Sequence, residues 1–180
     1  MNKKEIFTGI AVITFICGLS GYLLAQVYKT TKPKIEAIKR IEEEKLNKEI
    51  FPEAVKFEEK EINGIKYLSV LNSNNEEIGK IFEVKTLGYG GYIYLKVGID
   101  KENKIKKVKI KEHNETPGLG AKITQDSFLN QFIGKTKENI YLKKDKSNGR
   151  IDAITGATVS SRAIVDGIRK LLEDIGEKIN

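Results

Sequence analysis

The residues that most often build metal and thiol chemistry are nearly missing from this sequence. Among its 180 residues there is one cysteine, Cys17, and one histidine, His113. A structural zinc site or an iron–sulfur cluster needs several such ligands, so this chain is not expected to build either one. A disulfide within one chain is excluded, and a Cys–His catalytic pair is not expected because Cys17 lies in an apolar run. We therefore expect no metal site, and redox chemistry would depend on an organic cofactor.

Tryptophan is absent, and the other aromatic residues are few, with 7 Phe and 7 Tyr. A hydrophobic core can still form, because Ile, Val and Leu are frequent. Charged residues make up 32% of the chain and hydrophobic residues 39%. This composition is typical of a soluble globular body rather than of a membrane protein with many spans, and the length fits one domain.

Concentrated charge of one sign is also missing, although the chain is basic overall. The net charge is +7, from 32 Lys and Arg against 25 Asp and Glu. Such a balance can favour nucleic acid or an anionic membrane surface. Here the lysines are interleaved with acidic residues and do not form one basic block with aromatic residues between. We therefore expect no nucleic-acid partner.

The longest segment without charge covers residues 6–28. Lys3 and Lys4 precede it and Lys29 follows it. A helix rises about 1.5 Å per residue, so this segment is long enough to cross a hydrocarbon core of roughly 30 Å. The sequence predicts a transmembrane helix over 6–28, preceded by a cytoplasmic tail of residues 1–5.

A cleaved signal peptide is the competing interpretation of this segment. Its exit site would be poor, since Leu23-Leu24-Ala25 is the nearest match to Ala-x-Ala. A retained anchor is therefore favoured. The basic residues do not decide its orientation, because they stand on both sides of the segment and long domains cross largely regardless of charge.

Beyond the anchor, the sequence predicts a charged helical stalk over residues 29–51, exposed to solvent, and a domain over residues 52–180. Apolar residues alternate with period two between residues 55 and 110, which predicts antiparallel strands joined by tight turns at Asn63-Gly64 and Asn72–Asn75. The clearest alternating runs are 65–71, 92–99 and 105–110. Three glycines break the chain before the long second run.

The last third of the chain favours helices instead. A short helix is predicted over Phe128–Ile133, ended by Gly134, and the polar residues 143–150 are predicted to form a loop. A final helix is predicted from near Ser160, because an apolar stripe follows it. The fold class is therefore α+β, an antiparallel sheet with flanking helices, preceded by the transmembrane helix.

A string of small and hydroxyl residues, Asp152-Ala-Ile-Thr-Gly-Ala-Thr-Val-Ser-Ser161, leads into this last helix. Gly156 and Ala157 remove side-chain bulk, so a ligand can approach the backbone closely. Thr158 and the two serines place hydroxyls at a helix amino terminus, where N–H groups and the helix dipole favour a phosphate. Ordinary helix capping explains the same hydroxyls without a ligand, and the four residues 155–158 alone would favour that reading. The longer string is more specific.

This string resembles the attachment motif of the FMN-binding domain family. In that family the second Thr of [Ser/Thr]-Gly-Ala-Thr is joined to FMN by a phosphoester. The resemblance implies covalent FMN on Thr158, with Thr155 where the family usually has Ser. A second string, 115–120 (Glu-Thr-Pro-Gly-Leu-Gly), resembles the family element that lies against the flavin. Its other reading is a plain turn with a core leucine, but two matches about 40 residues apart in the expected order favour the family.

The resemblance implies roles for individual residues. Leu119 would pack on the flavin ring, and Lys122 would face the phosphate or the charge of a reduced flavin. No catalytic residue is implied. The implied cofactor-binding residues are Thr158, Thr155, Gly156, Ala157, Ser160, Ser161, Glu115, Thr116, Gly118, Leu119, Gly120 and Lys122.

The length, the single amino-terminal helix and the order of motifs are similar to the G subunits of Rnf ion-translocating electron-transport complexes. The related C subunit of the sodium-pumping quinone reductase ranks second. The resemblance implies electron transfer from ferredoxin to NAD coupled to ion movement, with no independent catalysis. It also implies three kinds of partner: other membrane subunits, the membrane, and a flavin transferase that attaches FMN from FAD. The domain would lie on the extracytoplasmic side of the cell (inner) membrane.

Two other functions stay open at this point. The chain would be a membrane-tethered interaction module without flavin if the Thr158 string only caps a helix. It would be a stand-alone flavoprotein reductase if it acts without partner subunits. No Gly-x-Gly-x-x-Gly fingerprint for a nicotinamide dinucleotide is present.

Overall fold

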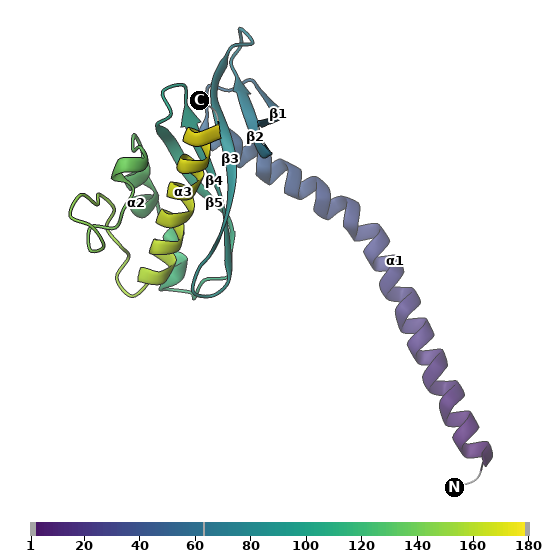
Figure 1. The fold of residues 1–180 in the computed structure, drawn as a ribbon. Helices are drawn as coiled ribbons and strands as arrows, with labels where there is room; N and C mark the ends of the chain where they lie inside the picture. The colour runs from purple at the N-terminus through teal and green to yellow at the C-terminus, as the bar shows by residue number, and fades with distance from the viewer. Residues whose placement is uncertain (1–2, 63, 179–180) are drawn as a thin grey trace. The chain divides into compact units, whose positions relative to one another are not determined.

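The computed structural model describes residues 3–62 and 64–178 of the chain. The chain divides into two compact units, residues 1–44 and residues 45–180. The described part of the first unit is helix throughout, and the second unit holds a sheet with helices (Figure 1). Of the predicted tail 1–5, residues 1 and 2 lie outside the described residues.

Helix α1 runs without a break over Lys3–Ile50, with Pro33 inside it. The sequence predicted an anchor helix over 6–28 and a helical stalk over 29–51, and the structure joins them in one helix. A proline inside a helix removes one backbone hydrogen bond. Because helix formation is cooperative, the segments on both sides of Pro33 remain helical. The helix ends at Ile50 because Phe51 precedes Pro52, and a residue before proline is disfavoured in the helical conformation.

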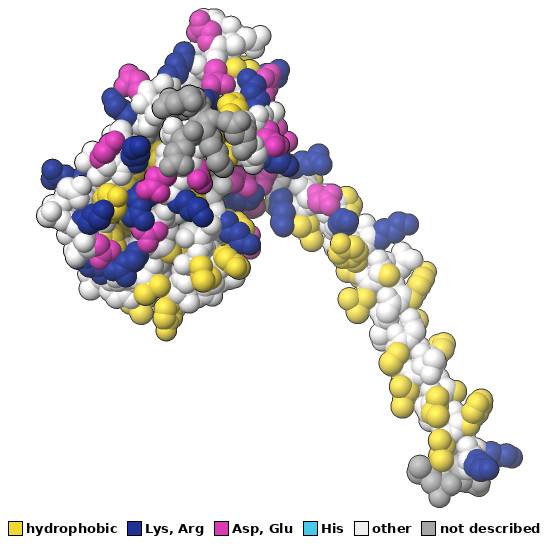
Figure 2. All heavy atoms as spheres, viewed as in Figure 1, with side chains coloured by type: hydrophobic (Ala, Val, Ile, Leu, Met, Phe, Trp, Pro, Cys, Tyr) yellow, Lys and Arg dark blue, Asp and Glu magenta, His cyan; other side chains and the backbone are white. Residues whose placement is uncertain are grey.

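In the first unit, the apolar side chains of α1 are exposed. Phe7, Ile13, Phe15 and Leu24 are each more than half exposed, and Figure 2 shows hydrophobic side chains along the helix. Among the described residues, the segment Ile6–Ile50 of this helix is the one long and apolar enough to cross a membrane. Exposed apolar surface of this size is stable in lipid but not in water.

The sheet of the second unit has five strands in the order β1-β2-β3-β4-β5, each antiparallel to the next. This confirms the predicted antiparallel sheet. The predicted runs at 65–71, 92–99 and 105–110 are β2, β4 and β5. The strand bounds are β1 Lys56–Ile62, β2 Ile65–Leu71, β3 Glu77–Leu87, β4 Tyr92–Asp100 and β5 Ile105–His113.

Both predicted strand connections can be located. In the first, Asn63 lies outside the described residues, while Gly64 has φ +83°. The second turn is confirmed, because the Asn72 side-chain oxygen accepts hydrogen bonds from the N–H groups of Asn74 (2.9 Å) and Glu76 (3.0 Å). Such bonds from an asparagine to its own following backbone are typical of turns.

The side chains of β4 point alternately to the two faces of the sheet, and both faces are buried there. Ile93, Leu95, Val97 and Ile99 belong to the main core, which also includes buried residues of helix α3. Helix α3 covers this face of the sheet (Figure 1). It runs over Thr158–Lys178, so it begins slightly before the predicted start near Ser160.

The opposite face of the sheet packs against the end of α1. Ile50 and Phe51 are buried there, and a Cβ added to Gly98 or Gly79 would lie 2.2 Å from Ile50 or 2.4 Å from Phe51. On the same face, the buried Lys96 ammonium donates to the Asn47 side-chain oxygen at 2.8 Å. The stalk predicted to be solvated is therefore buried at its last turn, because two strand glycines make room for it.

Short helices and a loop connect the sheet to α3. Instead of one helix over 128–133, the structure has α2 Asp126–Leu129 followed by the 3-10 helix η2 Asn130–Phe132. Gly134 follows with φ +72°. The loop predicted at 143–150 is confirmed, between the bridged residues Leu142 and Ile151. Two further 3-10 helices are η1 Gly120–Thr124 and η3 Lys137–Asn139.

Candidate functional site

The hydroxyl string predicted to bind a phosphate forms a tight turn at the start of α3. Gly156 has φ +79°, a conformation that residues with a Cβ rarely adopt. The Ala157 N–H donates to the Ile154 carbonyl at 3.0 Å and closes this turn. Thr158 is then the first residue of α3, and it is partly exposed. The first N–H groups of a helix have no carbonyl partner within it, so they are directed towards whatever lies at this end.

Ser161 holds the turn together from inside. Its fully buried hydroxyl donates to the Ala157 carbonyl at 2.9 Å and accepts from the Ile154 N–H at 3.0 Å. The Ser161 hydroxyl is therefore occupied by the backbone of the string. It fixes the conformation that presents Thr158.

Glu115 connects the two strings that the sequence singled out. This buried carboxylate accepts from the Ser160 hydroxyl at 2.5 Å and from the Gly90 N–H at 3.1 Å. Gly120 makes room for it, since a Cβ there would lie 2.6 Å from the Glu115 carboxylate. Glu115 thus joins the β3–β4 loop, the segment after β5 and the first turn of α3. The Glu115 N–H donates to Nδ1 of His113 at 3.2 Å, which gives the lone histidine a structural contact.

Leu119 lies beside the turn at Gly156 and is 48% exposed. A Cβ added to Gly156 would be 3.1 Å from a methyl group of Leu119. Leu119 is therefore not the core leucine that the plain-turn reading of the second string expected. Val159 and, on the β3–β4 loop, Tyr89 are exposed as well, at 50% and 75%. Apolar side chains therefore stand open to solvent near the start of α3.

A lysine that the sequence analysis did not single out reaches Thr158. The Lys144 ammonium donates to the Thr158 hydroxyl oxygen at 2.6 Å. Lys144 belongs to the polar loop 143–150, where a run of lysines gave no signal of a specific role. Lys122, predicted to face the phosphate, is exposed in η1, and it makes no side-chain hydrogen bond to Thr158 among the described residues. Its contact with a cofactor stays a prediction, as do those of Thr155, Thr116 and Gly118, which are also exposed.

The comparison with known proteins places this chain in a family. A family profile described as FMN-binding domain matches residues 88–173, which include both strings and most of α3. The chain is also 34% identical, over 97% of its length and 94% of the relative's, to the G subunit of the proton-translocating ferredoxin:NAD(+) oxidoreductase complex of Clostridium ljungdahlii. The chain belongs to the family of G subunits of ion-translocating oxidoreductase complexes. Together with the candidate span in α1, this membership indicates a membrane-anchored protein.

A second relative agrees with this assignment, and a solved structure shares the fold. The G subunit of an ion-translocating oxidoreductase complex from Methanosarcina acetivorans is 32% identical over 96% of this chain and 95% of the relative. The C subunit of the Na(+)-translocating NADH-quinone reductase from Parabacteroides distasonis has a similar structure, with a TM-score of 0.53 at 22% identity. That match covers 63% of this chain and 61% of the other, and it shows a shared fold.

The residues at the start of α3 fit the phosphate end of an FMN. A partly exposed hydroxyl, the first N–H groups of a 21-residue helix and an ammonium group meet there. The N–H groups and the ammonium stabilise negative charge, and the hydroxyl can be esterified by a phosphate. Gly156 is exposed, and a Cβ added there would lie 3.1 Å from a methyl group of Leu119. These groups can therefore hold a phosphate at the start of α3.

Proposed function

We propose that this chain, as the G subunit of its complex, carries FMN covalently through a phosphoester to Thr158 and passes electrons within that complex. The observation that carries the proposal is the Thr158 hydroxyl at the first residue of α3, 2.6 Å from the Lys144 ammonium. A threonine hydroxyl can form a stable ester with a phosphate, and the helix start and the ammonium offset the remaining negative charge.

The buried residues of the two strings have a different role from Thr158 in this proposal. The hydroxyls of Ser160 and Ser161 and the carboxylate of Glu115 are occupied by one another and by the backbone. They hold the turn that presents Thr158, rather than touching the phosphate. Leu119, half exposed beside Gly156, offers an apolar surface for the flat flavin ring.

The bound FMN would supply chemistry that this chain's own side chains lack, because a flavin exchanges one or two electrons. The name of the Clostridium ljungdahlii relative describes a ferredoxin:NAD(+) oxidoreductase complex that translocates protons. By analogy, this chain would transfer electrons between ferredoxin and NAD as one subunit, without catalysis of its own. The fold shared with the C subunit of a sodium-translocating quinone reductase keeps that complex as the second candidate.

The proposal also includes a topology. Residues 1–5 would form a cytoplasmic tail, 6–28 the membrane span, 29–51 a stalk and 52–180 the FMN-binding domain outside the cytoplasm. The exposed apolar side chains of α1 support the span. A domain on that side would meet its flavin transferase there, and would contact other subunits of the complex at the membrane.

The experiment that tests this function compares membranes from cells in which Thr158 of this chain is changed. Thr158→Val keeps the shape of the side chain but removes the hydroxyl, and Thr158→Ser keeps the hydroxyl. We expect ferredoxin-dependent NAD reduction to fall to background with valine and to persist with serine. Equal amounts of the other subunits in each membrane would show that assembly is intact. Reduction at the wild-type rate with valine would overturn the proposal.

A further inference from the structure

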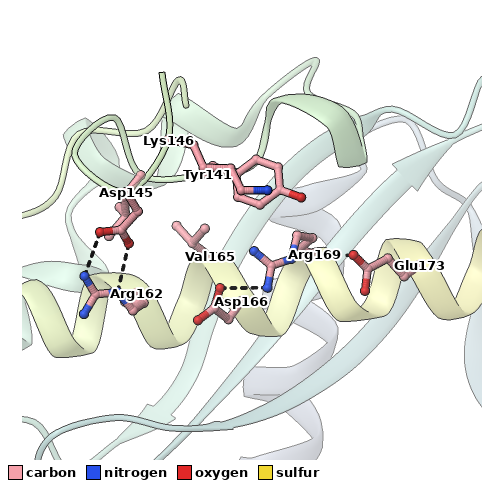
Figure 3. Close-up of a pocket in the computed structure, with 9 residues that line it drawn as sticks. Tyr141, Asp145, Lys146, Arg162, Val165, Asp166, Arg169 and Glu173 are labelled. Carbon is pink, nitrogen blue, oxygen red and sulfur yellow. Dashed lines mark hydrogen bonds and ion pairs between the residues drawn. The ribbon is translucent and has the colours of Figure 1, made fainter. Parts of the chain in front are cut away.

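The loop that carries Lys144 is fastened to the side of α3. The Arg162 guanidinium donates to both carboxylate oxygens of Asp145, at 2.9 and 2.8 Å. Such a two-bond contact between a planar guanidinium and a carboxylate fixes both partners in orientation as well as distance. Arg162 is on the turn of α3 that follows Thr158, so this ion pair anchors the loop close to the helix start (Figure 3).

A second contact fastens the beginning of the same loop. The Tyr141 ring has the Lys146 ammonium 3.8 Å from its centre and the Arg169 guanidinium 4.8 Å from it. Arg169 also pairs with Asp166 of α3 at 3.1 Å. These residues line an open pocket of about 440 Å³ between the loop and the helix (Figure 3). The loop is therefore attached to α3 over two turns of the helix. This attachment restricts the position of Lys144.

Lys144 and its neighbour Lys143 point to different partners. The Lys143 ammonium pairs with the Asp152 carboxylate at 2.6 Å, whereas the Lys144 ammonium reaches the Thr158 hydroxyl. Both lysines are exposed to solvent, carry the same charge and are adjacent in the same loop. Of the two, Lys144 is the one that contacts Thr158, whereas Lys143 contacts Asp152, so Lys143 serves as the control for a change of charge at the same place.

We propose that Lys144 is a positioning residue for FMN attachment to Thr158 and for holding the attached phosphate. This inference rests on the proposed function. In the attachment step, the Thr158 oxygen forms a bond to the FMN-side phosphorus of FAD, and the bond from that phosphorus to the bridging oxygen breaks. AMP leaves with that oxygen, and the hydroxyl proton passes to a base of the flavin transferase. No electron is gained or lost.

The hydrogen bond from Lys144 has two effects on this step. It occupies a lone pair of the Thr158 oxygen, so the hydroxyl proton is directed away from the Lys144 ammonium. It also places a positive charge beside the phosphate oxygens, whose negative charge must be stabilised while the bond forms. In the product, the ammonium stays within reach of a phosphodiester that keeps one negative charge.

The test follows flavin attachment to the purified full chain in detergent, with purified flavin transferase and FAD, by intact mass over time. We expect Lys144→Gln to slow attachment by about tenfold or more, because a charge-assisted contact to the reacting group is lost. Lys144→Arg restores the cation and should recover most of the rate. Lys143→Gln should stay within about twofold of wild type, since it removes only an exposed ion pair.

A second measurement separates positioning from folding. Fully loaded Lys144→Gln protein should show lower flavin fluorescence anisotropy than loaded wild type, while Lys143→Gln should not. Wild-type rate and anisotropy in Lys144→Gln would overturn the inference and leave the proposed function standing. Equal slowing by Lys143→Gln would also overturn it, by showing an effect of general charge. If wild type itself takes no flavin, the proposed function fails and this inference fails with it.

Discussion

At the scale of single residues, the conformation of Gly156 decides where the Thr158 hydroxyl points. Its φ of +79° turns the chain just before α3, and the hydrogen bonds of Ser161 depend on that turn. A side chain at such a φ is strained by contact between its Cβ and the backbone. The conformation of the hydroxyl string therefore depends on Gly156 as much as on the hydroxyl residues.

Gly156→Ala tests this point, with Gly134→Ala as its control. Both glycines have similar positive φ, but a Cβ at Gly134 meets nothing within 4 Å, while one at Gly156 meets Leu119 at 3.1 Å. We expect each change to lower the free energy of unfolding by about 1–2 kcal/mol, because both are strained. Only Gly156→Ala should also reduce flavin attachment, measured by intact mass. Normal attachment in Gly156→Ala would show that this turn does not position Thr158.

Lys144 shows why part of the site was not predicted from the sequence. The Thr158 string is a local signal: small and hydroxyl residues stand directly before an apolar stripe of helical period. Lys144 stands in a polar loop among other lysines, and its role depends on the path of that loop. That path is set by contacts distant in sequence, such as the Arg162 contact with Asp145.

At the scale of elements, features with a local sequence signal were again predicted, and features that depend on contacts distant in sequence were missed. Strands β2, β4 and β5 show clear alternation, so they were predicted. The burial of the end of α1 was missed because Asn47 and Ile50 look like the rest of a solvated helix. The signal that could have revealed it was glycine inside strands, at Gly79 and Gly98, which marks the close approach of another element.

Glu115 is the link between elements that can be tested most sharply. Glu115→Ala leaves the buried Ser160 hydroxyl without its carboxylate, and this should cost about 1–3 kcal/mol of unfolding free energy. In a Ser160→Ala background the same change should cost clearly less, since the hydroxyl is then absent. Urea unfolding of the four chains in detergent measures the coupling. Equal costs in both backgrounds would mean that the Glu115–Ser160 contact does not stabilise the fold.

The loop at 143–150 should depend on pH through Asp145. Hydrogen bonding from Arg162 holds the pKa of the Asp145 carboxyl below its usual range, and the charge of Lys144 acts in the same direction. A lowered pKa stabilises the folded state above the usual aspartate value, and this stabilisation is lost as the pH falls through the lowered one. The loop should therefore stay fastened to α3 at neutral pH and loosen only below about pH 4.

Hydrogen exchange of the peptide containing Asp145 measures this transition. In wild type, protection should persist down to about pH 4 and fall below it. Asp145→Asn should lose part of the protection already at pH 7, because the charged contact with Arg162 is gone. Protection in Asp145→Asn that matches wild type at every pH would contradict the assigned role of the ion pair.

At the scale of the whole molecule, two kinds of surface occur in one chain. The first unit exposes apolar side chains along α1, while the second has basic and acidic side chains interspersed over its surface (Figure 2). The first surface suits lipid and the second suits water. The G subunits of the two complexes compared above match nearly the full length of the chain, so their similarity extends over both units.

The most direct test of the central claim, covalent FMN on Thr158, is the intact mass of the full chain after co-expression with a flavin transferase. We expect wild type and Thr158→Ser to gain the mass of one FMN less one water, with in-gel flavin fluorescence. Thr158→Val should keep the unmodified mass and show no fluorescence. The same mass gain in Thr158→Val, or an unmodified mass in wild type, would show that Thr158 does not carry FMN as a phosphoester.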